Sequence, residues 1–243
     1  MIKFFRKIRY DLMEKNKTGK YFKYAIGEIV LVVFGIIIAL QINNWNEERK
    51  KQNLKNEYLI SLENDYKKDT LQLNQRINQN KKRLELLNQS FDEIENTTFT
   101  RPEEIISILK NKYGNGPRVI NTYNTNSFNL LISSGHIDLL DKQIRESIME
   151  LNRLQVFENE VSSSNRDYFL GFMSNYFLKY PAEYSNKSLN QILWKGADLN
   201  ELPKDLIAFF DQERYTIYRY LELSEDVLLQ TKLVLNQLED YKN

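Results

Sequence analysis

Glu28 is the residue whose type and position most suggest chemistry, because it lies inside an otherwise apolar stretch. Residues 24–42 read YAIGEIVLVVFGIIIALQI, in which only Glu28 and Gln41 are polar. A carboxylate in such surroundings is costly unless it pairs with a cation or serves an ion path. Two interpretations follow: either Glu28 reaches the lipid headgroups or pairs with Lys20 or Lys23, or it faces a partner helix or an ion path.

Small residues share a helical face with Glu28. Gly35 and Ala39 are four residues apart and form a small-xxx-small pattern, and Ile42 lies on the same side. Such a pattern lets two helices approach closely within a bilayer. It gives weak support for oligomerisation there, since the pattern is common.

A second group with catalytic residue types is Ser134, His136 and Asp138, in the run SSGHIDLLD. A serine, a histidine and an aspartate are the members of a hydrolase triad, but triad members usually come from distant parts of a fold, and no G-x-S-x-G motif is present. We therefore interpret this run as a turn that docks Ile137, Leu139 and Leu140 into a core, and we expect no catalytic residues.

Composition excludes several other functions. The chain has no cysteine and one histidine, which rules out disulfides, thiol catalysis and a multi-histidine zinc site. Residues 1–43 carry eight basic and three acidic groups, so the remainder of a chain with net charge +1 is mildly acidic. Because no basic stripe remains outside the N-terminus, we expect no nucleic-acid partner. We also expect no cofactor, no metal and no enzymatic activity.

The elements that position Glu28 follow from the apolar stretch. Its 19 residues give about 28 Å of helix, close to the ~30 Å hydrocarbon core of a bilayer. The alternatives are a buried core helix, which would normally show a polar stripe, and a signal peptide, which would end in a small-residue cleavage site. We predict a cytoplasmic basic amphipathic segment over 1–19, a transmembrane helix over 20–45 and a helical bundle over 46–243.

Orientation follows from the flanking charges, because basic residues concentrate on the cytoplasmic side of a span. Eight lysines and arginines precede the span, whereas the residues just after it mix both signs. Tyr21, Tyr24 and Trp45 lie where interfacial aromatic residues are expected. The prediction is a single-pass protein of the inner membrane, with a cytoplasmic N-terminus and an extracytoplasmic C-terminal part.

The run YAIGEIVLVVFGIIIALQINNWNEERK, preceded by MIKFFRKIR, resembles the N-terminal signature of an uncharacterised family of single-span membrane proteins of Bacteroidota. The resemblance is close over residues 1–60 and looser beyond. It implies a location and an architecture but no activity. It also singles out the polar and small positions of the motif: Gly27, Glu28, Gln41, Asn43, Asn44, Trp45 and Asn46.

Beyond the span, helical patterns dominate, and we predict long helices over 46–95, 141–178 and 203–241. Short helices are predicted over 103–112, after a capping box at Thr100, and over 127–134, closed by Gly135. Residues 182–202 are predicted to be a loop that carries Trp194 over one end of the bundle.

Seams that would join the long helices follow spacings of three, four or seven. In the first helix one row is Leu59, Tyr66, Leu73, Asn80, Leu87 and Ile94, and a second is Leu62, Thr70, Ile77, Leu84 and Phe91. The second helix offers Ile144, Ile148, Leu151, Leu154 and Val161. The last offers Ile207, Phe210, Arg214, Ile217, Leu221, Ser224, Leu228, Thr231, Leu235 and Leu238. Arg214 would need a carboxylate partner if buried.

The expected fold is all-α, with a transmembrane helix that continues into an elongated antiparallel bundle, and with two short helices and loops at one end. Three functions fit it: a scaffold or interaction module of the cell envelope, a ligand-binding or sensory domain acting through a partner, and an ion-coupled subunit using Glu28. The third resembles the single-span stator subunits of biopolymer-transport and flagellar motors. The expected partners are the lipid bilayer and a protein partner or a second copy of the chain.

Overall fold

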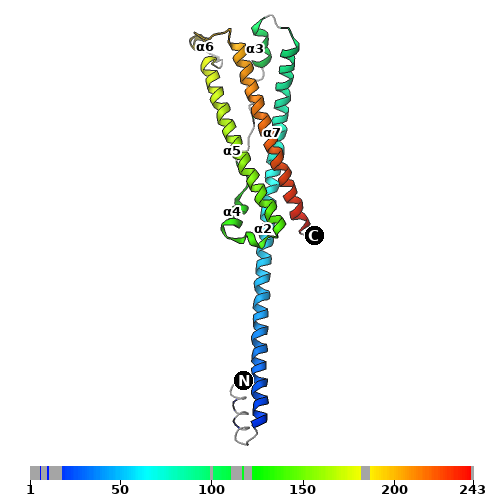
Figure 1. The fold of residues 1–243 in the computed structure, drawn as a ribbon. Coiled ribbons are helices and arrows are strands. Elements are labelled where there is room, and N and C mark those ends of the chain that lie inside the picture. The colour runs from blue at the N-terminus through cyan, green and yellow to red at the C-terminus, as the bar shows by residue number, and fades with distance from the viewer. Residues whose placement is uncertain are drawn as a thin grey trace. The chain divides into compact units, whose positions relative to one another are not determined.

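The computed structural model describes residues 6, 10, 18–98, 101–110, 117, 122–181 and 187–241. Across these residues every regular element is a helix and none is a strand. The elements are α2 (Thr18–Asn96), α3 (Pro102–Lys110), α4 (Asn126–Ser133), the 3₁₀ helix η1 (His136–Leu139), α5 (Lys142–Lys179), α6 (Lys187–Leu193) and α7 (Leu202–Asp240) (Figure 1). The expected all-α fold, with an apolar N-terminal helix and a helical bundle, is confirmed.

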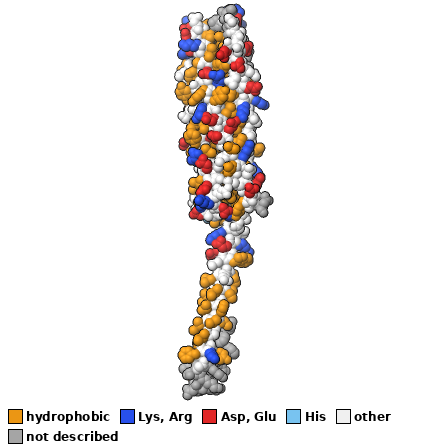
Figure 2. All heavy atoms as spheres, turned by 45° about the vertical axis from the view of Figure 1, so that its right-hand side comes forward, with side chains coloured by type: hydrophobic (Ala, Val, Ile, Leu, Met, Phe, Trp, Pro, Cys, Tyr) orange, Lys and Arg blue, Asp and Glu red, His pale blue; other side chains and the backbone are white. Residues whose placement is uncertain are grey.

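The chain divides into two compact units, Met1–Glu57 and Tyr58–Asn243. In the first unit the apolar stretch of α2 lies on the surface, and Figure 2 shows its hydrophobic side chains exposed. The expected basic segment over 1–19 lies almost entirely outside the described residues. Thr18 and Gly19, at the end of that segment, already belong to α2. One glycine costs a long helix only about 1 kcal/mol, so it does not stop the helix.

The second unit is built on three long helices, and cross-helix hydrogen bonds give their directions. Tyr220 bonds Ser162, and Gln230 bonds Ser147, so α7 runs antiparallel to α5. Bonds from Arg83 to Glu213 and from Arg76 to Ser224 likewise make α7 antiparallel to α2. Asp69 pairs with Gln155, and Arg76 with Glu158, so α5 runs parallel to α2. A parallel neighbour requires the chain between α2 and α5 to return along the bundle.

The short helices α3 and α4 lie at opposite ends of the bundle. The expectation that they share one end is therefore wrong. Leu109 of α3 packs with Leu206 and Phe210 near the start of α7. Ser127 of α4 instead bonds Asp65, close to where α2 enters the bundle (Figure 1). The physical reason is the parallel course of α5, which must begin at the end where α2 enters.

A further correction concerns residues 182–202, which do not form a continuous loop. Residues 187–193 form helix α6, and Trp194 follows it, packed against the apolar core. The cap of α4 is as expected: Gly135 has φ 72°, a left-handed conformation that glycine adopts at little cost. The capping box at Thr100 lies outside the described residues, although Pro102 does open α3.

Buried positions on α2 follow spacings of three and four, and one of the two predicted rows is wrong. The row from Leu59 through Tyr66, Leu73, Asn80 and Leu87 is buried. In the second row only Leu62 and Ile77 are buried, whereas Thr70, Leu84 and Phe91 are half-buried. The positions that continue the seam from Leu62 are Asp69, Arg76, Arg83 and Ser90, all buried.

On α5 and α7, too, the buried positions differ from the predicted rows. On α5 the buried residues that directly follow Leu151 are Gln155, Glu158 and Ser162, rather than Leu154 and Val161. On α7 the expected row holds at Phe210, Ile217, Leu221, Ser224, Thr231 and Leu238, but its other members are half-buried, and the seam is completed by Leu206, Glu213, Tyr220, Val227 and Val234. On α2 and α5 the predicted rows chose mostly apolar side chains where the bundle buries polar ones, whereas on α7 most of the missed positions are apolar.

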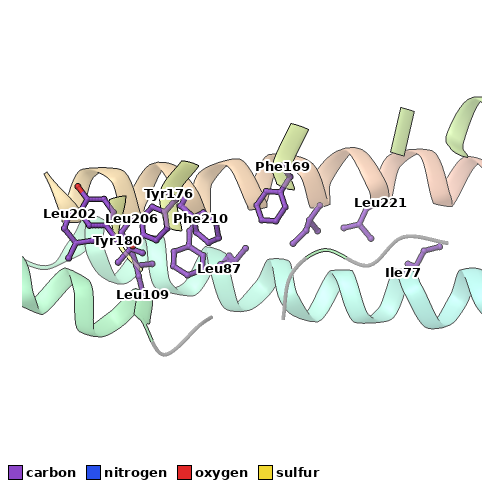
Figure 3. Close-up of a cluster of buried hydrophobic side chains, with 12 residues drawn as sticks. Ile77, Leu87, Leu109, Phe169, Tyr176, Tyr180, Leu202, Leu206, Phe210 and Leu221 are labelled. Carbon is purple, nitrogen blue, oxygen red and sulfur yellow. The ribbon is translucent and has the colours of Figure 1, made fainter. Parts of the chain in front are cut away.

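An apolar cluster fills the part of the bundle that contains α3 and α6. Rings of Phe169, Tyr176 and Phe209 pack with centroids 5.1–5.7 Å apart. Figure 3 shows Phe210 beside Leu87 and Leu206, between the helices. Aromatic side chains late in α5 therefore contribute to the core of the bundle.

This packing makes Leu87 a stability determinant, and Leu71 on the same helix is its matched control. Leu87 is fully buried, whereas Leu71 is 72% exposed. Leu87→Ala should lower the free energy of unfolding by about 2–5 kcal/mol, because the cavity is not refilled. Leu71→Ala should change it by at most about 0.5 kcal/mol. Denaturant unfolding of the chain in detergent micelles, followed by circular dichroism, measures both, and equal losses would contradict the burial of Leu87.

Candidate functional site

Polar and charged side chains fill the middle of the bundle and form its most unusual feature. Arg83 on α2 and Glu213 on α7 make a two-pronged ion pair, with N···O distances of 2.7 Å for both bonds. Their side chains are only 6% and 2% exposed. The guanidinium of Arg83 also lies over the Phe210 ring, 5.8 Å from its centroid. A paired charge of this kind links α2 to α7 beside the apolar cluster.

Arg76 and Glu158 form the centre of the polar network. Arg76 Nη1 donates to Glu158 Oε1 at 2.9 Å, and Arg76 Nη2 donates to Ser224 Oγ at 2.5 Å. Glu158 also accepts hydrogen bonds from Tyr123 Oη at 2.8 Å and from Ser162 Oγ at 2.8 Å. One carboxylate thus holds α2, α5 and the segment before α4 together. Among the described residues, Arg76 Nε has no hydrogen-bond acceptor.

Tyr123 acts as a donor in this network. Burial raises the pKa of its phenol far above the ordinary value, and the neighbouring Glu158 carboxylate adds to the rise. The hydroxyl therefore stays protonated and donates to Glu158. Burial raises the pKa of Tyr220 in the same way, and its hydroxyl donates to the backbone oxygen of Ser162.

Two carboxylates of α2 hold the start of α4. Asp65 Oδ2 accepts from the backbone nitrogen of Ser127 at 3.3 Å and from its hydroxyl at 2.6 Å. Asp69 Oδ1 accepts from the backbone nitrogen of Asn124 at 3.0 Å and from its amide at 2.7 Å. Thr125, the residue before α4, makes no side-chain cap. Asp65 supplies the cap instead, and its negative charge suits the positive end of the helix.

The hydrogen-bond donors of Asp69 are all neutral, whereas Glu158 and Glu213 each accept from an arginine. Besides Asn124, Asp69 accepts from Gln155 Nε2 at 3.2 Å, and the side chain is fully buried. Burial raises the pKa of Asp69 above its ordinary value, although the bonds from Asn124 and Gln155 oppose the rise. The carboxylate is therefore held without a counter-charge that bonds it directly.

The residues singled out from the sequence lie elsewhere, in the first unit. Glu28 on α2 is half-buried. The other residues predicted to form a functional group with it are exposed: Gly35, Ala39, Gln41, Asn43, Asn44 and Trp45. Asn43 Nδ2 donates to Glu47 Oε1 at 3.0 Å, and Arg49 lies over the Trp45 ring, 5.4 Å from its centroid. These are contacts within one helix.

Ser134, His136 and Asp138 do not have the geometry of a catalytic triad. Tyr58 Oη lies between two of them, 3.1 Å from Ser134 Oγ and 2.9 Å from His136 Nδ1. Asp138 pairs with Arg145 at 2.9 Å. The arrangement joins the start of α2's bundle segment to the turn after α4. Of the residues expected to dock into the core, Leu140 is buried, and Ile137 and Leu139 are half-buried.

Arg214 does not occupy the buried position expected for it. It is partly exposed, pairs with Asp211 on its own helix at 2.7 Å, and lies over Phe91, 4.6 Å from the ring centroid. Glu213, one residue earlier, takes the seam position. The sequence signal that could have found the buried network is the seven-residue spacing that continues from Leu62: Asp69, Arg76 and Arg83.

A cleft of about 500 Å³ lies at the α6 end of the bundle, away from the polar network. Three lysines and three acidic residues line it: Lys179, Lys195, Lys204, Asp198, Glu201 and Asp205. Tyr180 Oη donates toward Asp205 at 3.1 Å, and burial raises the pKa of Tyr180 to about 12. Within the described part of the chain, no group of three or more histidine or acidic residues could hold a metal ion.

Removing one member of the Arg83–Glu213 pair should be far more damaging than removing both. Arg83→Met leaves a buried carboxylate unpaired and should cost about 3–5 kcal/mol of unfolding free energy. The double variant Arg83→Met with Glu213→Leu should recover most of that loss. Arg153→Met, which breaks the exposed pair with Glu150, is the control and should cost under about 1 kcal/mol. Denaturant unfolding measures all three; additive losses would show that the pair is not coupled.

Asp69 should lower the free energy of unfolding as pH rises, which is the opposite of the usual trend for a carboxylate. Because its folded-state pKa is raised above the ordinary value, its contribution is fully present below pH 3.8 and is lost as pH rises through the folded pKa. Asp69→Asn keeps an oxygen for Asn124 without the charge, so it should raise the melting temperature at neutral pH, with the gain vanishing in acid. Asp69→Ala should destabilise at every pH, because it strands the Asn124 donors. If Asp69→Asn instead lowered the melting temperature only at neutral pH, the raised pKa of Asp69 would be contradicted.

Residues 28–193 match the model of a protein family described as "Family of unknown function (DUF6090)". No curated protein and no solved structure matches the chain. The matched range begins at Glu28 and ends with α6, so it contains the apolar stretch of α2 together with Asp69, Arg76, Arg83 and Glu158 of the polar network. Because the match covers more than half of its length, the chain belongs to the family of unknown function DUF6090.

Proposed function

We propose that this protein is a single-span membrane protein whose helical bundle serves as a scaffold or interaction module in the cell envelope, without catalytic activity. The observation that carries the proposal is the apolar part of α2. It is long and apolar enough to cross a membrane, and none of its 18-residue apolar window is buried against the rest of the chain.

Lipid is the solvent that suits this surface. The window exposes a continuous run of aliphatic and aromatic side chains, among them Leu31 at 60% and Phe34 at 60% exposed. A soluble protein rarely leaves an apolar area of this size in water. The core-helix alternative loses its support because a core helix would be covered by its own chain. A helix also satisfies every backbone hydrogen bond internally, which a bilayer demands.

Orientation in the proposal rests on the charge asymmetry of the sequence. The excess of lysine and arginine before the span favours a cytoplasmic N-terminus and an extracytoplasmic bundle of the inner membrane. Arg49 over the Trp45 ring is a contact that suits the polar rim of a bilayer, where tryptophan is enriched. Gly35 and Ala39, both exposed, offer a face for a second copy or a partner helix.

The scaffold role is supported by how the bundle uses its charges. The exposed fractions of Arg76 and Glu158 are 4% and 1%, so solvent and substrates have almost no access to the network. Acids and bases placed for catalysis would open toward a cleft. These side chains instead bond to one another across three helices, and buried polar pairs of this kind can specify a single helix register. A rigid bundle with one register suits a structural or interaction role.

The cleft at the α6 end favours a second candidate, a ligand-binding or sensory domain that acts through a partner. Its volume of about 500 Å³ and its lysine and acidic lining suit a small polar ligand. A metabolite panel added to the full chain in detergent distinguishes the two functions. A ligand bound in the cleft should raise the melting temperature, and Lys195→Ala should abolish that shift.

Anchoring by α2 is tested with charges placed in the window. Val33→Lys with Ile37→Lys should release the chain from membranes in an alkaline wash, because each central lysine costs about 2.5–3.5 kcal/mol on insertion. The matched control, Leu71→Lys with Leu229→Lys, places lysines at exposed apolar positions of the bundle and should stay with the membrane. Release of the wild-type chain by the same wash would end the proposal. A C-terminal tag shielded from protease added to spheroplasts would reverse the orientation.

A further inference from the structure

The α6 end of the bundle exposes aliphatic side chains that its own fold does not cover. They are Leu178 at the end of α5, Leu189, Ile192 and Leu193 on α6, and Leu199 before α7. Their exposed fractions are 81%, 48%, 69%, 44% and 60%. We call these five residues the apolar tip. The elements that carry them border one apolar cluster, in which Tyr180, Trp194 and Leu202 pack together.

The tip is poorly suited to a stable protein partner. At roughly 100 Å² for a full aliphatic side chain, the five expose on the order of 300 Å² of apolar surface. A stable interface needs about 800 Å² from each partner. Leu178 and Leu193 line the cleft at this end, but most of its other lining residues are lysines and acids, so the tip does not form an apolar groove. A lipid surface, in contrast, accepts protruding aliphatic side chains without shape matching.

The charges around α6 favour anionic lipid. Residues 187–197 read KSLNQILWKGA, with a lysine near each end of α6 and no acidic residue. Both Lys187 and Lys195 are exposed. Of the acidic residues between α6 and the first turn of α7, Glu201 pairs with Lys204 and Asp205 with Lys179, and Asp198 is exposed beside Leu199. A short helix with apolar side chains and flanking lysines is typical of segments that lie in the headgroup region, where the lysines reach the phosphates.

We propose that the apolar tip inserts into the surface of an anionic bilayer, with Lys187 and Lys195 on lipid phosphates. This contact is separate from the apolar window of α2 and does not depend on it. Because α4 and the entry of α2 lie at the other end of the bundle, the contact assigns a binding role to the end remote from Tyr58 (Figure 1).

The experiment uses the full chain held in phosphatidylcholine nanodiscs, so that the window of α2 already has its lipid. The nanodiscs are mixed with larger vesicles of phosphatidylcholine, with or without phosphatidylglycerol, and separated by flotation. We expect the nanodiscs to float with the anionic vesicles only. Ile192→Glu and Leu199→Glu should each weaken this partition roughly tenfold or more, because a carboxylate replaces an inserted aliphatic chain.

Matched controls separate the tip from general surface hydrophobicity. Leu71 and Leu229 are 72% and 70% exposed on α2 and α7, so Leu71→Glu and Leu229→Glu should float like the wild type. Circular dichroism melting checks that every variant is folded. Wild-type nanodiscs that stay unbound, or tip and control variants that lose binding equally, overturn the proposal. Nanodiscs that associate without vesicles, through the same tip residues, would identify a second copy as the occupant and overturn it as well.

Discussion

The Arg76–Glu158 ion pair is the interaction on which the arrangement of the bundle depends. It lies almost fully buried between α2 and α5, and Ser224 brings α7 to the same guanidinium. Burying two charges costs several kcal/mol of desolvation for each, which only close pairing and additional hydrogen bonds offset. Glu158 meets that condition by accepting from Arg76, Tyr123 and Ser162 together. A slip of one helix by a single turn would break these bonds and leave charges buried without partners.

The need to give buried carboxylates hydrogen-bond donors also explains how the chain is held between the C-terminal end of α2 and the start of α5. The segment before α4 brings Tyr123 to Glu158 and Asn124 to Asp69, and α4 itself is capped by Asp65. Acids of the long helices thus accept the hydrogen bonds that this connection needs. The parallel pairing of α2 with α5 follows, because the connection must run the length of the bundle before α5 begins.

The apolar and polar regions of the bundle contribute differently to stability and to the choice of helix register. Near α3 and α6, Leu87, Phe209 and Phe210 pack tightly, and burial of apolar surface supplies most of the stability there. In the middle, charged pairs contribute less net stability but strongly disfavour alternative registers. The apolar window of α2 belongs to neither region, since none of it is buried within the described part of the chain. Its stability must come from surroundings outside the protein, for which lipid is the physical candidate.

Local signals in the sequence determined where α2 and α5 end, and that α2 contains an apolar window long enough to cross a bilayer. Asn96, Pro102, Gly135 and Pro181 act within a turn of themselves, so no knowledge of the fold is needed to use them. The buried rows of the long helices were harder to predict from the sequence. Periodicity alone gives two candidate rows one residue apart, and hydrophobicity favours Ile77 and Leu84 over Arg76 and Arg83. Only the tertiary structure decided between those rows. A buried arginine is tolerable only when a carboxylate from another helix meets it, and the partners Glu158 and Glu213 lie 82 and 130 residues away in sequence.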